Sequence, residues 1–198
     1  MKKFVLKYYL ELFTAFVLVF TVIDGVLYPK ISDYRKLINL FMVLGVLHEW
    51  EEKRFPGGIF ELMAKKIGLK QEKEKFDISG MIVILYWIII TCIPYICDKY
   101  TFLVLIPVVL GLFEAFVHTI GIFIQKMKKP YTPGLITAWI MAIASVYTIY
   151  YLEANNLVVA SDYILGVILM FGSFIFMDIA IIRTFRISPK EMMANIKR

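Results

Sequence analysis

The chain contains two histidines, and each has a glutamate about one helical turn away. His48 is followed by Glu51 and Glu52, and Glu114 precedes His118 by four residues. On a helix, Glu51 and Glu52 lie about 60° before and about 40° after His48, so the three side chains share one face. Glu114 and His118, at positions i and i+4, share a face as helix-borne metal ligands often do. Both histidines therefore have the neighbours and the spacing of a metal site.

Imidazole and carboxylate groups together suit Zn²⁺ or non-haem iron, and fewer than four fixed ligands leave room for an activated water. The sequence thus predicts a divalent metal site, with Zn²⁺ favoured over iron. The predicted ligands are His48, Glu52, Glu114 and His118. Glu51 is the predicted catalytic residue, which accepts a proton from the bound water and returns it to the leaving group. Two other interpretations stay open: a metal-free proton or substrate site, and a polar network that only joins two helices.

Two further acidic residues are predicted to lie outside this site. Glu49 is about 100° around the helix from His48, so its side chain can point elsewhere. Asp24 lies inside the first apolar run, toward the predicted outer leaflet, and an acid at that depth requires a partner. Neither residue is included among the predicted ligands.

The elements that carry these residues have the composition of membrane-spanning helices. Of the 198 residues, 60% are apolar and 19% are charged, whereas soluble domains average about 45–50% apolar and about 25% charged residues. A spanning helix needs roughly 20 mostly apolar residues. We therefore predict an all-α polytopic membrane bundle, a single transmembrane domain over residues 1–198 in the cell membrane. Its six predicted spans cover about residues 8–28, 34–52, 78–96, 102–125, 134–152 and 162–182.

Basic residues mark alternate connections between these spans. Lys and Arg are frequent in the N-terminal residues, the connections 53–77 and 126–133, and the tail after residue 182. Because such residues concentrate in cytoplasmic loops, both termini are predicted to be cytoplasmic. The same pattern accounts for the net charge of +6, so the expected partners are membrane lipids and not nucleic acid. Residues 57–69 have apolar and basic positions at helical spacing, which predicts an amphipathic helix on the membrane surface.

The second apolar run predicts the depth of the site. Residues 37–47 are too few to cross a bilayer alone, so His48 and the glutamates after it lie inside the hydrocarbon or at its cytoplasmic edge. In the fourth span a polar stripe interrupts an otherwise apolar helix. Its members are Gly111, Glu114, His118, Gly121 and Gln125. Such a stripe should face a partner helix and not lipid, so we expect the two histidines to converge between these helices near the inner leaflet.

His48-x-x-Glu51-Glu52 at the end of a membrane span resembles the signature of the HXXEE-domain membrane proteins. The chain also resembles the downstream pattern of that family. The residues that carry this resemblance are Glu114, His118, Tyr131-Thr132-Pro133-Gly134 and Thr137. The pattern often has Asn where Thr132 stands. The resemblance covers about residues 37–150, and it implies the His/Glu site but no established reaction.

The function predicted from this site is that of a metal-dependent membrane enzyme, most simply a hydrolase acting on a lipid or lipid-linked substrate at the cytoplasmic leaflet. The sequence leaves open a carrier or binding protein that uses the same residues for protons, metal ions or a cationic ligand. It also leaves open a non-catalytic structural subunit, and it does not indicate an oligomeric state. The likeness to CAAX-type membrane proteases is partial, because Pro56 stands where their motif has arginine and Glu114 where it has phenylalanine.

Overall fold

The computed structural model describes residues 2–27, 32–67, 72–124 and 126–185, and this part of the chain is all-helical, with no strand. Within it, seven α-helices and one short 3₁₀-helix follow one another. They are α1 (Lys2–Leu27), α2 (Asp33–Lys53), α3 (Ile59–Ile67), α4 (Lys73–Ile96), η1 (Thr101–Val104), α5 (Leu105–Ile124), α6 (Leu135–Ala154) and α7 (Ala160–Phe185). The predicted all-α fold is confirmed.

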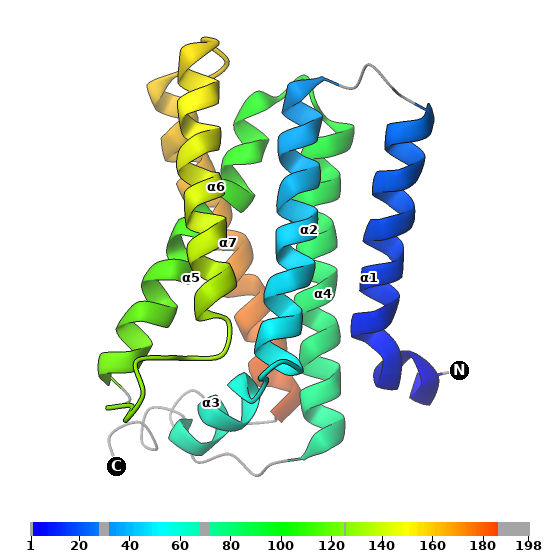
Figure 1. Cartoon of the computed structure of the whole chain (residues 1–198), viewed down its shortest axis with the longest axis vertical. Helices are drawn as coiled ribbons and strands as arrows, with labels where there is room; N and C mark the ends of the chain where they lie inside the picture. Colours follow the sequence, from blue (N-terminus) through cyan, green and yellow to red (C-terminus); the bar gives the residue numbers. More distant parts are fainter. Residues whose placement is uncertain (1, 28–31, 68–71, 125, 186–198) are drawn as a thin grey trace.

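The six long helices run alternately up and down one bundle, and the short α3 lies at one of its ends (Figure 1). α2 and α4 pack against each other in the middle, with α1 on one side and α5 and α6 on the other. The start of α1 and the end of α7 lie at the same end of the bundle as α3. The two ends of the described chain therefore share a side, while the assignment of that side to the cytoplasm stays a prediction.

Five segments of the described chain are long and apolar enough to cross a membrane: α1, α4, η1 with α5, α6 and α7. These are the features of a membrane protein. α2 has a comparable length of 21 residues, but charged residues at both of its ends leave it less apolar than the others. The sixth predicted span, over α2, stays a prediction.

Each predicted span overlaps one long helix, and the predicted surface helix at 57–69 overlaps α3. Several helices are longer than their apolar segments: α4 begins at Lys73 and α7 ends at Phe185. The helical backbone continues through polar flanking turns, which a count of apolar residues excludes. Residues 28, 68–69 and 125, at the ends of three predicted helices, lie outside the described residues, as does the basic tail after residue 185.

The central position of α2 explains how it holds charged residues. Ile38 and Phe41 of α2 are both 0% exposed, because α1, α4 and α6 pack around this helix. His48, Glu49 and Glu51, near its C-terminal end, are buried as well. The polar residues of α2 therefore point into the protein instead of toward lipid, as intramembrane ionisable groups generally do.

α5 and α6 approach closely beside this helix. A Cβ atom on Gly111 of α5 would lie 2.6 Å from the Ser145 Oγ of α6, so a residue without a side chain permits the contact. The Ser145 hydroxyl donates to the Met141 carbonyl of its own helix at 2.8 Å, which satisfies this buried polar group. Gly111 is about one turn from Glu114, so the contact also fixes where α5 presents its polar stripe.

Candidate metal centre

The C-terminal turns of α2 carry the first half of the site. The helix begins with Ser32, whose hydroxyl accepts a hydrogen bond from the Arg35 amide at 3.4 Å. Asp33 in the first turn and Lys53 in the last turn complement the helix dipole. After Arg54 the chain turns through Gly57 and Gly58 at positive φ, so the helix ends directly after the His–Glu motif.

Four polar side chains from α2 and α5 converge at one point. His118 Nε2 lies 3.2 Å from Glu52 Oε1 and 3.5 Å from Glu114 Oε2. His48 Nε2 lies 3.6 Å and 3.9 Å from the same two oxygens. The imidazole rings meet edge to face, with centroids 5.2 Å apart and an interplanar angle of 87°. All four predicted ligands are thus brought together, and we call them the His/Glu site.

The distances within the His/Glu site agree with a tetrahedral metal site. Zinc bonds of about 2.0–2.1 Å to nitrogen and oxygen place neighbouring ligand atoms roughly 3.3–3.4 Å apart. The four measured nitrogen–oxygen separations run from 3.2 Å to 3.9 Å. His48, Glu52 and His118 also offer one ligand atom each within 4.8 Å of one another. His48, Glu52 and His118 could therefore hold a metal ion, and Glu114 lies beside this group of three.

The second nitrogen of each histidine is held by a threonine. His48 Nδ1 lies 3.0 Å from Thr137 Oγ1, and that hydroxyl donates to Glu51 Oε2 at 2.5 Å. His118 Nδ1 lies 3.1 Å from Thr132 Oγ1, and that hydroxyl donates to the His118 carbonyl at 3.2 Å. Since each hydroxyl proton is engaged elsewhere, each threonine oxygen accepts from Nδ1–H. The Nε2 atoms of both rings then face the two carboxylates, to which they donate when the rings are protonated; a neutral ring offers there the lone pair that metal ligation requires.

The His/Glu site is enclosed without being sealed. His48 and His118 are buried, whereas the side chains of Glu52 and Glu114 are 15% and 16% exposed. The carboxylates therefore form the accessible side of the site, with the imidazoles behind them.

Glu51 lies next to the His/Glu site and points toward α6. Its Oε1 accepts from the Tyr131 hydroxyl at 2.7 Å and from the Ile136 amide at 3.1 Å. Its Oε2 accepts from the Thr137 amide at 2.8 Å and from the Thr137 hydroxyl. Burial, and then the hydrogen bond to Glu51, raise the pKa of the Tyr131 phenol, so the phenol remains a donor. Glu51 thus caps the N-terminus of α6, where a carboxylate is favoured.

Gly134, at the start of α6, lies against the His118 and Glu52 side chains of the His/Glu site. It caps α6 with φ of 94°, a left-handed conformation that favours glycine. A Cβ atom here would lie 2.6 Å from His118 Cε1 and 2.8 Å from Glu52 Cγ. Both the backbone and the neighbouring ligands therefore require glycine at this position.

The two acids predicted to lie outside the site have partners of their own. Glu49 accepts from the Trp87 indole of α4 at 2.9 Å and pairs closely with Lys53. We call Glu49, Lys53 and Trp87 the Glu49 cluster. Asp24 accepts from Asn39 at 2.7 Å and from the Tyr95 hydroxyl. Neither acid contributes an atom to the His/Glu site.

A family model described as a protein of unknown function with HXXEE motif matches residues 39–151, more than half of the 198-residue chain. The chain belongs to this family. The match confirms the predicted resemblance and includes the three motif residues, His48, Glu51 and Glu52. No curated protein and no solved structure matches the chain. In this structure the family motif divides, since His48 and Glu52 enter the His/Glu site while Glu51 caps α6.

The two threonines that hold the histidines had no assigned role in the site from spacing. Thr137 belongs to a face of small residues, which is more typical of helix packing than of a site. Thr132 lies in a connection, 14 residues from His118. The available signals were the downstream family pattern, which contains both residues, and the rule that a ligand histidine is bonded through its other nitrogen. Neither signal states which threonine meets which histidine.

Proposed function

We propose that this protein is a metal-dependent membrane enzyme, a hydrolase acting on a lipid or lipid-linked substrate from within the cell membrane. One observation carries the proposal: two histidine Nε2 atoms lie 3.2–3.9 Å from the same two carboxylate oxygens. Four groups with lone pairs at such distances suit a divalent cation, and the mixed nitrogen and oxygen donors favour Zn²⁺ over iron.

In this proposal His48, His118 and Glu52 hold the ion, and Glu114 lies beside them. When bound, the ion would supply Lewis acidity and lower the pKa of a water. Three protein ligands leave one position open for that water, as in catalytic zinc sites. Glu114 has the longer distances to each of the two histidines, at 3.5 Å and 3.9 Å. It is therefore the group that can either complete the site as the predicted fourth ligand or accept a proton at the open position.

The predicted proton transfer by Glu51 stays a prediction, and the contacts of this residue favour a positioning role. Both of its oxygens already accept hydrogen bonds, from Tyr131 and from the first turn of α6. A proton acceptor needs an oxygen within hydrogen-bond reach of the reacting water. Glu51 instead holds Thr137, which holds His48, so it acts on the site through two other side chains.

A lipid-type substrate is supported by the surroundings of the site. Val117, one turn along α5 on the same side as Glu114, is apolar and 40% exposed, and the exposed face of α5 continues from there. In a bilayer such a face meets acyl chains. A substrate that already lies in the membrane could therefore reach the partly exposed carboxylates of Glu52 and Glu114 without crossing an aqueous loop.

The first test is elemental analysis of the protein purified in detergent without chelators. The wild type should retain about one zinc ion per chain, and His48→Ala and His118→Ala should each lose it. Glu153→Gln is the matched control, because this carboxylate is exposed and bonds only the Tyr163 hydroxyl. Wild-type protein that binds no metal, before or after incubation with Zn²⁺, would contradict the proposal.

The second test uses enzymatic activity to distinguish the roles of Glu51 and Glu114. The protein is reconstituted in vesicles of mixed phospholipids, and hydrolysis products are analysed by mass spectrometry with and without a chelator. Glu114→Gln should abolish turnover, whereas Glu51→Gln should reduce turnover and zinc affinity together. The reverse result, with Glu114→Gln active and Glu51→Gln folded, metal-loaded and inactive, would support the original prediction for Glu51. Proton uptake into proteoliposomes without hydrolysis, lost in Glu114→Gln, would favour a carrier.

A further inference from the structure

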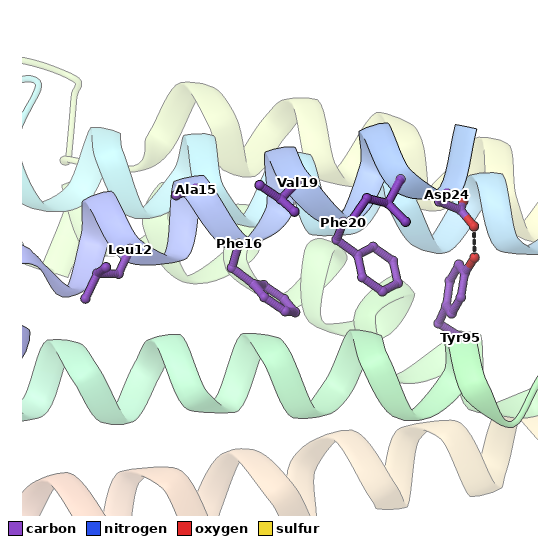
Figure 2. Close-up of a pocket in the computed structure, with 8 residues that line it drawn as sticks. Leu12, Ala15, Phe16, Val19, Phe20, Asp24 and Tyr95 are labelled. Atoms are coloured by element: carbon purple, nitrogen blue, oxygen red, sulfur yellow. Dashed lines mark hydrogen bonds between the residues drawn. The ribbon is translucent and has the colours of Figure 1, made fainter. Parts of the chain in front are cut away.

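A cavity lies between α1 and α4, away from the His/Glu site. Its volume is about 560 Å³. Apolar side chains line most of it, and Figure 2 shows Phe16 and Phe20 of α1 directed into the space toward α4. α2 and α4 separate α1 from α5 and α6 (Figure 1), so this cavity is distinct from the metal centre. The lining residues are Leu12, Ala15, Phe16, Val19, Phe20, Ile23, Asp24 and Tyr95.

One end of this groove is polar. Asp24 is only 5% exposed and accepts from Tyr95 and Asn39 (Figure 2 shows the bond to Tyr95). Behind these residues Arg35 lies over the Tyr95 ring, 4.9 Å from its centroid, and pairs with Asp98 at 2.9 Å. The charge of Arg35 is therefore compensated by Asp98, and Asp24 has no cationic partner among the described residues.

Two buried atoms at this polar end have no hydrogen-bond partner within the described chain. They are Asn39 Oδ1, an acceptor, and Arg35 Nε, a donor. An unsatisfied buried polar atom is costly, so such atoms point to a ligand or to water. Neither Asn39 nor Arg35 lines the groove, so the polar groups that the groove itself offers to a ligand are those of Asp24 and Tyr95.

The length of the groove agrees with one acyl chain. Leu12 and Asp24 are twelve residues apart on α1, which is about 18 Å along a helix. One leaflet of the hydrocarbon core is roughly half of about 30 Å thick. Asp24 lies within the last turn of α1 (Lys2–Leu27), so the polar end falls near the level of lipid head groups while the apolar part extends along the acyl chains.

We propose that this groove binds one phospholipid with a primary-amine head group. Its acyl chain lies along α1 between Phe16 and Phe20, and its ammonium donates to Asp24, the charged residue that lines the groove. The ammonium supplies a positive charge that no described residue provides to Asp24, and charge-assisted hydrogen bonds of this kind are the strong ones. This site does not depend on the proposed enzymatic function.

The test is native mass spectrometry of the purified full-length chain with three lipids of identical acyl chains. The head groups are a primary amine, a trimethylated amine that cannot donate hydrogen bonds, and an anionic glycerol. Wild type should prefer the primary-amine lipid by roughly tenfold, the effect of about one strong hydrogen bond. Equal binding of the three lipids, or a preference for the anionic lipid, would overturn the proposal.

Three variants separate the head-group contacts from the chain contacts. Asp24→Asn should remove the head-group preference while the chain still binds, and Ala15→Phe should fill the groove and abolish binding of all three lipids. Ile164→Phe is the matched control, because Ile164 is 64% exposed on α7 and does not line the groove. Tyr95→Phe, which keeps the ring and removes the hydroxyl, provides a head-group variant if Asp24→Asn does not fold. Wild-type lipid binding in Ala15→Phe and in the head-group variant would contradict the proposal.

Discussion

Two polar clusters lie about 100° apart around the last turns of α2, and their contacts differ in kind. In the Glu49 cluster, the carboxylate is met by two donors, the Lys53 ammonium and the Trp87 indole. In the His/Glu site, two carboxylates are met by two imidazole Nε2 atoms. The first cluster is neutral and complete as a set of side chains. The second is balanced either by protons on the imidazoles or by a bound cation.

The comparison teaches that burial alone does not separate a structural cluster from a binding site. Glu49 is 1% exposed and His48 is 2% exposed. What differs is the chemistry of the groups that meet the carboxylates. An ammonium and an indole join α2 to α4 in the Glu49 cluster, while the His/Glu site brings together imidazoles and carboxylates, which are also metal ligands. Four predictions follow this contrast, from the largest expected effect to the smallest.

Lys53→Met should destabilise the fold and leave metal binding unchanged. The side chain of Lys53 is 4% exposed beside the Glu49 carboxylate, and removing one partner of a buried ion pair costs about 3–5 kcal/mol. Chemical denaturation in detergent measures the loss, and elemental analysis measures zinc per folded chain. The double variant Glu49→Leu/Lys53→Met should recover most of the stability. Loss of zinc from folded Lys53→Met would show that the two clusters are one site.

Metal removal should destabilise the wild type through the His/Glu site only. An ion present at a thousand times its Kd contributes about 4 kcal/mol to the apparent free energy of unfolding. Thermal unfolding with and without added Zn²⁺ after chelation measures this contribution. His118→Ala should show no response to zinc. An equal response in wild type and in His118→Ala would place the stabilising ion elsewhere.

Thr137→Val and Thr132→Val should each weaken zinc binding by roughly 10–100-fold, the usual effect of removing the partner of a ligand histidine. Each substitution removes the oxygen that accepts from Nδ1–H, at 3.0 Å from His48 and 3.1 Å from His118. Zinc competition against a chelating dye measures the affinity. Thr148→Val is the control, since the buried Thr148 hydroxyl bonds only the Ala144 carbonyl of its own helix. Equal affinities in all three variants would argue against histidine positioning by these threonines.

Gly134→Ala should cost about 1–2 kcal/mol for the left-handed backbone and should also weaken zinc binding. The new Cβ would lie 2.6 Å from His118 Cε1, so the imidazole must move. Gly58→Ala is a close control, because Gly58 has φ of 98° and nothing within 4 Å of the added Cβ. Denaturation should give similar losses for the two variants, and zinc titration should separate them. Unchanged zinc affinity in Gly134→Ala would show that the site tolerates this movement.

The pairing of each histidine with a glutamate on the same helix face could be predicted from each helix by itself. The spacings from His48 to Glu52 and from Glu114 to His118 are fixed by 3.6 residues per turn, so each pair shares a face wherever the helix packs. Long apolar runs require lipid or a large core, which predicts the helical bundle. The role of Glu51 could not be obtained in this way, because it also lies on the His48 face and only its contact with the start of α6 directs it elsewhere.

The sequence by itself determined the helices, the membrane-protein composition, the family and the residues able to ligate a metal, because these follow from local periodicity and residue chemistry. Only the tertiary structure decided which acid faces which donor. Thr132 and Thr137 meet the two histidines, Glu51 caps α6 and Glu49 pairs with Lys53. These contacts depend on how α2, α5 and α6 rotate and approach one another, and that is set by packing at positions such as Gly111 and Gly134.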